Sequence, residues 1–111
     1  MNVAIIGSRK FTNYSEFLKL MPKLNITKII SGGAVGADSL AHRYALDNNI
    51  EYLEFLPDWN LHGKSAGPIR NKLIINEADY VIAFWDGRSK GTANSIKLAQ
   101  QKGISINVIN I

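Results

Sequence analysis

Short apolar runs alternate with segments of helical periodicity along the whole chain, and this alternation constrains the fold more than any other feature. The runs Val3–Ile6, Ile29–Ile30 and Val81–Phe84 are continuously apolar, as strands covered on both faces are. Strands separated by helices imply right-handed crossovers and a parallel sheet. We expect five strands, at Asn2–Ile6, Lys28–Ser31, Glu51–Leu56, Tyr80–Trp85 and Ile104–Ile111.

The polarity of two strands indicates where they lie in the sheet. Ile104, Ile106 and Val108 alternate with polar residues in the last strand, and Glu51 and Glu54 interrupt the third. We therefore expect both strands at the edges, which gives the order 3-2-1-4-5. In such sheets, ligands bind beyond the carboxyl ends of the strands, here near the crevice between the first and fourth. The prediction is a single α/β domain over residues 1–111, with helices on both faces of the sheet.

The segments between the strands carry helix signals. Asn13 and Glu16 have the spacing of a capping box, and the apolar residues up to Leu24 follow at helical intervals. Pro57–Gly67 is expected to be a long polar loop. The remaining signals are Leu40, Ala41, Tyr44 and Ala45 on one helix face, Pro68 in the first turn of a helix through Ile69, Leu73 and Ala78, Thr92 as an N-cap, and Gly103 as a helix end.

Composition excludes several classes of protein. The 111 residues fit one domain, and without cysteine there is no disulfide or thiolate-metal chemistry. No apolar run is long enough for a membrane span, and no signal peptide is recognisable, so we expect a cytoplasmic protein. The net charge of +4 is mild, but basic residues fall in or beside the strand-to-helix loops, where an anion would bind. These residues are Arg9, Lys10, Lys64, Arg70, Arg88 and Lys90.

The strongest local signal is Ser31-Gly32-Gly33-Ala34-Val35-Gly36-Ala37-Asp38. Glycines let the backbone approach a ligand, and the unpaired N–H groups of the helix that follows suit phosphate. The segment matches neither the dinucleotide fingerprint nor the P-loop. A tight turn that needs glycine for packing alone is the alternative interpretation. Asp38 can be explained by the helix dipole, or it can bind a ribose hydroxyl.

Two further loops are expected at the same sheet edge. Ser89-Lys90-Gly91-Thr92 opens a helix after the fourth strand, and Ser8-Arg9-Lys10 follows the first strand. Their hydroxyl, ammonium and guanidinium groups can donate to phosphate oxygens. Three loops that converge on one edge make a stronger case for an anion site than any one of them.

Aromatic and titratable residues give weaker signals. Trp59 and Trp85 lie at or just past strand ends, where each could stack on a base or pack in the core. Arg70 is expected in a helix first turn, where a cation is disfavoured unless it has a function. Asp86 lies near the crevice, whereas Asp79 begins the fourth strand at the opposite end and is expected to be structural. The two histidines occur in different settings and suggest no metal site.

With these loops in view, the sequence resembles the SLOG superfamily, which joins DNA-processing-protein-A-like domains to the LOG phosphoribohydrolases. The resemblance is to a small stand-alone bacterial and phage branch, and it implies a Rossmann-like three-layer fold, nucleotide-derived ligands and frequent dimers. It spans nearly the whole chain. The matching stretches are Gly7-Ser8-Arg9-x-Phe11, Ser31-Gly32-Gly33-Ala34-x-Gly36-Ala37-Asp38-x-Leu40-Ala41, Asp58-Trp59, Gly63-Lys64-x-Ala66-Gly67-Pro68-x-Arg70-Asn71 and Phe84-Trp85-Asp86-Gly87 with Ser89-Lys90-Gly91-Thr92.

The chain departs from the LOG enzymes at one position. Arg70 and Gly91-Thr92 correspond to parts of their site, but the glutamate that follows there is replaced by Ala93, Asn94 and Ser95. An amide cannot do the acid–base work of a carboxylate, so the resemblance favours binding over catalysis. The predicted ligand-binding residues are Gly7, Ser8, Arg9, Ser31, Gly32, Gly33, Ala34, Gly36, Asp38, Trp59, Lys64, Arg70, Asn71, Trp85, Asp86, Ser89, Lys90, Gly91 and Thr92.

Three functions are compatible with these residues. The first is a module that senses or sequesters an ADP-ribose-like ligand, a cyclic nucleotide or a nucleoside phosphate, with no cofactor and with a homo-oligomer expected. The second is a nucleotide N-glycosidase or phosphohydrolase, with Arg70 and either Asp86 or Asp38 as candidate catalytic residues. The third is single-stranded DNA binding, which ranks lower because basic residues are few.

Overall fold

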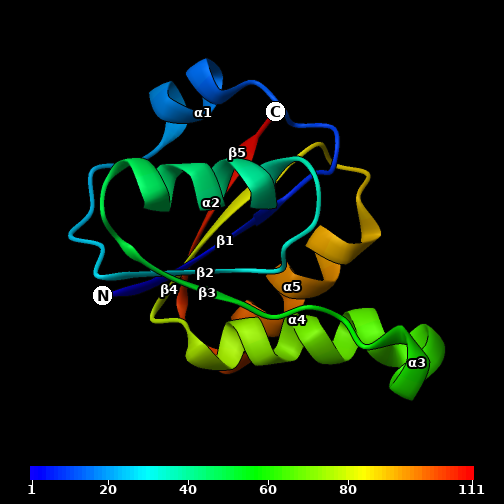
Figure 1. Ribbon diagram of the computed structural model, residues 1–111. Helices are drawn as coiled ribbons and strands as arrows, with labels where there is room; N and C mark the ends of the chain where they lie inside the picture. The colour runs from blue at the N-terminus through cyan, green and yellow to red at the C-terminus, as the bar shows by residue number, and fades with distance from the viewer.

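The computed structural model describes residues 1–111 and has five parallel strands in one sheet, ordered β3-β2-β1-β4-β5 (Figure 1). Both edge strands and the switch point between β1 and β4 are therefore as predicted. The central pair runs in register from Val3 opposite Tyr80 to Gly7 opposite Phe84. The strands are β1 (Asn2–Gly7), β2 (Lys28–Ser31), β3 (Glu51–Glu54), β4 (Tyr80–Trp85) and β5 (Ser105–Asn110).

Helices cover both faces of the sheet and make the predicted third layer. In Figure 1, α1 (Tyr14–Leu20) and α2 (Ala37–Asp47) lie above the sheet, whereas α4 (Ala66–Glu77) and α5 (Lys90–Lys102) lie below it. Alternate strand residues point to opposite faces. Val3 and Ile5 thus join the core between the sheet and the helices α1 and α2, and Ala4 joins the core between the sheet and the helices α4 and α5. No helix is both long and apolar enough to cross a membrane.

The segment predicted as a long polar loop is mostly helical. It contains α3 (Trp59–His62), the 3₁₀ turn η1 (Gly63–Ser65) and the start of α4. The carboxylate of Asp58 caps α3 by accepting a hydrogen bond from the Leu61 N–H at 3.0 Å. Four residues are too few for an apolar period to show in the sequence, so the prediction of a loop was wrong.

Three helix boundaries also differ from the prediction. α1 ends at Leu20, because Pro22 forces Met21 into an extended conformation, and the segment up to Leu24 is not helical. Ser89 caps α5 in place of Thr92, whose N–H donates to the Ser89 hydroxyl. α4 ends one residue before Ala78.

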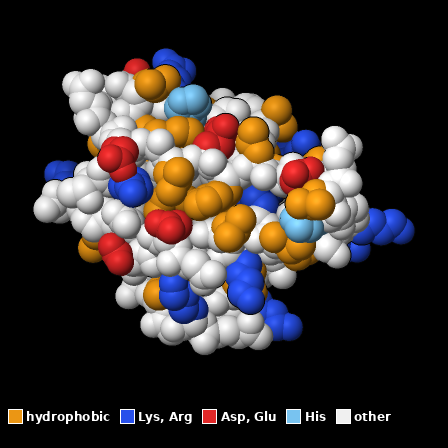
Figure 2. Space-filling model, turned by 60° about the horizontal axis from the view of Figure 1, so that its bottom comes forward, with side chains coloured by type: hydrophobic (Ala, Val, Ile, Leu, Met, Phe, Trp, Pro, Cys, Tyr) orange, Lys and Arg blue, Asp and Glu red, His pale blue; other side chains and the backbone are white.

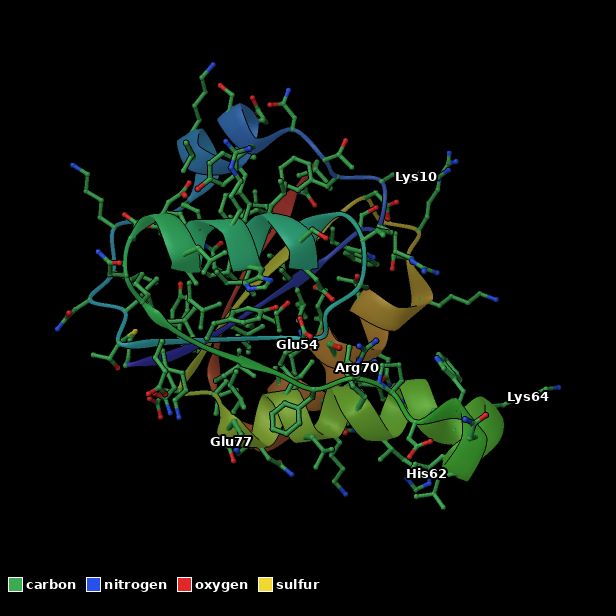
Figure 3. All side chains as sticks on the ribbon, in the orientation of Figure 1. Lys10, Glu54, His62, Lys64, Arg70 and Glu77 are labelled. Carbon is green, nitrogen blue, oxygen red and sulfur yellow. The ribbon has the colours of Figure 1, made fainter.

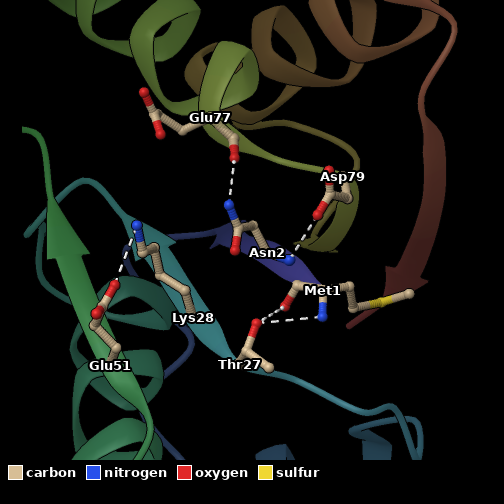
Figure 4. Close-up of polar contacts among 7 residues, drawn as sticks. All are labelled: Met1, Asn2, Thr27, Lys28, Glu51, Glu77 and Asp79. Atoms are coloured by element: carbon tan, nitrogen blue, oxygen red, sulfur yellow. Dashed lines mark hydrogen bonds and ion pairs between the residues drawn. The ribbon is translucent and has the colours of Figure 1, made fainter.

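The amino ends of the strands are fastened by polar contacts, far from the carboxyl edge (Figure 4). The backbone N–H of Asn2 donates to the Asp79 carboxylate at 2.8 Å, and the side-chain amide of Asn2 donates to the Glu77 carbonyl at 3.3 Å. Lys28 and Glu51 form an ion pair at 3.1 Å between β2 and β3. The structural role predicted for Asp79 is therefore confirmed.

Candidate functional site

A cavity of about 600 Å³ opens at the carboxyl edge of the sheet. Its walls come from the segments after β1, β2, β3 and β4 and from the first turns of α2, α4 and α5. The volume lies within the usual range for small-molecule sites. Of the predicted ligand-binding residues, the cavity brings together Gly7, Arg9, Gly32, Gly33, Ala34, Asp38, Trp59, Arg70, Asn71, Ser89, Lys90, Gly91 and Thr92.

The starts of α2 and α5 give the cavity wall a positive character, because their first turns have N–H groups without intrahelical partners and the positive ends of helix dipoles. The start of α4 differs, since it continues the turn η1, its Ala66 N–H donates to the Gly63 carbonyl, and Pro68 has no N–H. Arg9 and Lys90 add two exposed cations, and Arg70 adds a half-buried one. Asp38 is the one carboxylate among the lining residues. The cavity is therefore suited to an anion, with a single acidic group in its wall.

The β2–α2 turn is fixed to the β1 loop through Gly36, which precedes α2. Gly36 has φ of 84°, and a Cβ there would collide with the backbone carbonyls of Ser8 and Arg9. Because glycine allows this approach, the Ala37 N–H donates to the Ser8 carbonyl at 3.1 Å. Gly36 itself lies behind the cavity wall, where it holds two of the loops together.

Arg70 joins α4 to the glycine turn, and Figure 3 shows it at the junction of the helix and the sheet edge. Its Nη1 donates to the Gly32 carbonyl at 2.7 Å, and its Nε donates to the Asn71 side chain at 3.0 Å. Burial lowers the pKa of Arg70, which the neighbouring Asp38 partly offsets. No hydrogen bond uses Nη2, so this nitrogen remains available to a ligand.

Asp38 is a buried carboxyl group in the cavity wall, with 7% of its surface exposed. Its Oδ2 accepts a hydrogen bond from the Ala34 N–H at 3.1 Å. Burial raises the pKa of Asp38, although the Ala34 N–H and the Arg70 charge oppose this shift. A carboxylate has about four acceptor positions, so acceptor capacity remains for a ligand.

Two cavity residues on α5 were missed in the sequence. Asn94 accepts a hydrogen bond from the Asn71 amide at 3.1 Å, and Ser95 lines the same wall. They follow Gly91 by three and four residues, which places all three on one helix face. That spacing was the available signal. Leu56, Pro57, Gly67 and Pro68 were also missed, and they line the cavity on the β3–α4 side.

Six predicted residues lie outside the cavity, because their polar groups or positions serve the loops. Asp86 accepts from the N–H groups of Arg88 and Ser89 at 2.8 and 2.9 Å, which lowers its pKa. It also accepts from the Ser8 hydroxyl at 3.2 Å, and both residues line a separate hollow. The other four residues are Ser31, Gly36, Lys64 and Trp85. The Ser31 hydroxyl donates to the Ile5 carbonyl, and the Trp85 indole donates to the Ser89 carbonyl. Lys64 points into solvent (Figure 3), and Gly36 lies behind the cavity wall.

The family can be assigned from a comparison with known proteins. Residues 1–62 match the model of the YAcAr family, described as the YspA, cpYpsA-related SLOG family. The chain belongs to this SLOG family. Gene 61 protein of Mycobacterium phage D29 is 39% identical to this SLOG protein over 84 residues, which are 70% of this chain and 67% of that protein. The resemblance to the SLOG superfamily is thus confirmed.

Two solved structures resemble the SLOG protein over nearly its whole length. DNA processing protein A (DprA) from Streptococcus pneumoniae matches 96% of the chain with a TM-score of 0.80 and 22% identity, which shows the shared fold. DprA from Helicobacter pylori, described by its single-stranded DNA binding mode, matches 97% with a TM-score of 0.73 and 28% identity. The chain spans 49% and 64% of these two proteins.

Proposed function

We propose that this SLOG protein binds a phosphate-bearing, nucleotide-derived small molecule in the cavity at the carboxyl edge of its sheet. The observation that carries the proposal is the convergence of the first turns of α2 and α5 on one cavity that also contains Arg9, Arg70 and Lys90. The three cations and the N–H groups of these two first turns stabilise an anion, and the backbone N–H groups do so without reorganisation.

The side chains that line the cavity near α5 favour binding over turnover. The first two turns of α5 contribute amide and hydroxyl groups from Thr92, Asn94 and Ser95 to the wall, and no carboxylate. Asp86, one of the candidate acid–base groups, lies outside the cavity with both oxygens engaged. A sensor or a sequestering protein needs recognition alone, and the wall is rich in donors for that purpose.

A calorimetric titration with AMP, cyclic AMP and ADP-ribose tests the proposal, and Lys90→Ala is the informative variant. Lys90 lines the cavity, whereas Lys97 is an exposed lysine on the same helix outside it. We expect Lys90→Ala to weaken binding by roughly three- to tenfold, since one charge-assisted contact is lost. Lys97→Ala should leave binding unchanged. Equal affinities for the two variants, or no binding by the wild type, would contradict the proposal.

Hydrolysis of the ligand is a second candidate activity, because the Asp38 carboxyl group and the Arg70 guanidinium lie close together beside Gly32 in the cavity wall. Incubation with nucleoside monophosphates and ADP-ribose separates this activity from binding alone. Release of free base or phosphate that Arg70→Ala abolishes would establish turnover. Bound but intact nucleotide after prolonged incubation would leave binding as the function.

Single-stranded DNA binding is a third candidate, and the likeness to the H. pylori DprA structure favours it. DNA binding falls steeply with salt, because each neutralised phosphate releases counterions. A short oligonucleotide whose affinity drops by several powers of ten between low and physiological salt would support this function. No shift of the oligonucleotide at low salt would remove it.

A further inference from the structure

The chemistry of the cavity wall changes systematically along the order of the strands. At the β3 end the wall is apolar and aromatic, with Leu56, Pro57 and Trp59. After β2 it carries the glycine turn with Asp38 and with the Arg70 guanidinium that bonds to Gly32. After β1 and β4 it carries Arg9 and Lys90. Because neighbouring strands lie about 4.8 Å apart, these four strand ends span about 14 Å.

Trp59 makes the apolar end suitable for a flat ring. The side chain is 58% exposed, and its Cη2 atom lies 3.6 Å from the position that a Cβ on Gly67, in the first turn of α4, would occupy. An exposed indole that lines the cavity with Leu56 and Pro57 is a surface on which a nucleobase can stack. The cationic end lies on the other side of the glycine turn.

Asp38 occupies the middle of this gradient. The neighbouring Arg70 shares its charge with Asp38 and already bonds to Gly32 and Asn71, whereas Arg9 and Lys90 are exposed and lie apart from any cavity carboxylate. Because a carboxylate repels phosphate, the phosphate group of a ligand belongs at the Arg9 and Lys90 end. What a buried carboxylate accepts from a ligand is a hydrogen bond, and the hydroxyl groups of a pentose lie between the base and the phosphate of a nucleotide. The order of the wall groups thus matches the order of base, sugar and phosphate.

We propose that Asp38 recognises the sugar hydroxyls of the bound nucleotide and that the cavity therefore discriminates ribonucleotides from deoxyribonucleotides. The inference rests on the proposed nucleotide binding and adds the substrate class: a ribonucleoside 5′-phosphate with its base on Trp59. A site that holds a buried polar group for a ligand hydroxyl rejects analogues without that hydroxyl, because the group is then left unpaired.

The test compares AMP, GMP, CMP and UMP with their 2′-deoxy and 3′-deoxy counterparts by calorimetry, with inorganic phosphate as a separate probe. We expect the best ribonucleotide to bind at least about tenfold more tightly than one of its deoxy forms. In Asp38→Asn the two should bind within about twofold of each other, since the amide accepts fewer hydrogen bonds. Asp47→Asn, at the far end of α2, should keep the wild-type preference.

The outcomes separate this inference from the proposed function. Equal wild-type affinity for ribonucleotides and both deoxy forms overturns the role of Asp38 while nucleotide binding stands. Binding of neither nucleotides nor phosphate overturns both proposals. Because the wild-type comparison needs no variant, the inference stays testable even where Asp38→Asn folds poorly. A preference that persists in a folded Asp38→Asn protein assigns the discrimination to another group and overturns the inference.

Discussion

Asp38 and Asp86 lie in neighbouring loops at the same edge of the sheet, and their surroundings act on them in opposite directions. Burial raises the pKa of Asp38, whereas N–H donation from Ser89 and Arg88 lowers the pKa of the exposed Asp86. Burial of the Asp38 carboxylate costs free energy of folding, whereas the Asp86 carboxylate stabilises its own loop. A buried carboxyl group with a shifted pKa is typical of binding sites, and a carboxylate that accepts hydrogen bonds from its own loop has a structural role.

We predict that Asp38→Asn raises the melting temperature at neutral pH. The folded protein holds the Asp38 proton more tightly than the unfolded chain, so wild-type stability falls as pH rises from the ordinary carboxyl pKa through the raised one. Asn does not ionise and can still accept from the Ala34 N–H. Circular dichroism melts from acidic to neutral pH should show the gain growing with pH. A variant less stable than the wild type at neutral pH would contradict the prediction.

Asp86→Asn should have the opposite effect. Because the folded pKa of Asp86 lies below its ordinary value, the carboxylate stabilises the fold above that ordinary value, and the contribution is lost as pH falls towards the folded pKa. The variant should melt below the wild type at neutral pH, and the two curves should converge in acid. A gap that stays constant with pH would mean that the charge of Asp86 is irrelevant.

Among the helices, α1 and α5 have N-cap side chains that accept the same kind of backbone hydrogen bond but lie in different places relative to the cavity. Asn13 accepts from the Glu16 N–H at the start of α1, and Ser89 accepts from the Thr92 N–H at the start of α5. Only Ser89 lines the cavity. The sequence predicted Thr92 as the cap, because Ser89 and Thr92 both carry a hydroxyl group just before the helical apolar pattern. The choice between them depends on the backbone turn that Asp86 stabilises by accepting from the Arg88 and Ser89 N–H groups.

Replacing either cap by alanine should lower the free energy of unfolding by about 1 kcal/mol. The effect on binding should differ, because Ser89→Ala releases the first turn of α5 in the cavity wall and Asn13→Ala disturbs α1 on the other face of the sheet. Denaturant unfolding and nucleotide titration of both variants check this. An equal loss of affinity in the two variants would show that general destabilisation, and not the α5 turn, is responsible.

Gly91 and Gly103 are the two glycines at the ends of α5, and they should respond oppositely to alanine. A Cβ on Gly91 meets nothing within 4 Å, so Gly91→Ala should stabilise the helix by about 0.5 kcal/mol while its methyl group narrows the cavity. Gly103 ends α5 with φ of 79°, so Gly103→Ala should cost about 1 kcal/mol and leave binding unaltered. Denaturant unfolding measures the stability of both variants, and nucleotide titration measures their affinity. A Gly103→Ala variant more stable than the wild type would contradict the expected backbone strain of alanine at this position.

For the whole molecule, the order of the strands could be predicted because burial of a strand determines its composition. Val3–Ile6 is apolar throughout, as a central strand is, and Glu51 indicates an edge strand. The loops at the carboxyl edge followed from that order. Side chains were harder to assign, since a hydroxyl or carboxylate in a loop looks the same whether it faces a ligand or the backbone. Ser31 and Asp86 proved to bond within the protein, and Asn94 reached the cavity through helix geometry that only the start of α5 fixes.

The outer surface of α4 carries exposed apolar side chains, from which we predict that the protein associates with itself. Ile69 and Leu73, which lie one helical turn apart on α4, are 38% and 45% exposed. Figure 2 shows apolar side chains gathered over this side of the molecule between charged ones. Contiguous apolar surface is typical of interfaces, so sedimentation should give a mass above 12.3 kDa that Leu73→Glu reduces. A wild-type mass of 12.3 kDa at high concentration would contradict self-association through this surface.

The two tryptophans of the chain lie near different parts of the cavity, Trp59 in its wall and Trp85 outside it next to Ser89. Trp59 is exposed on α3, and the Trp85 indole donates to the Ser89 carbonyl at 3.1 Å just before α5. The protein therefore carries two intrinsic fluorophores, one beside the apolar end and one behind the cationic end. Emission from Trp59→Phe and Trp85→Phe would report each end separately, so that the orientation of a bound nucleotide could be read in solution without a label.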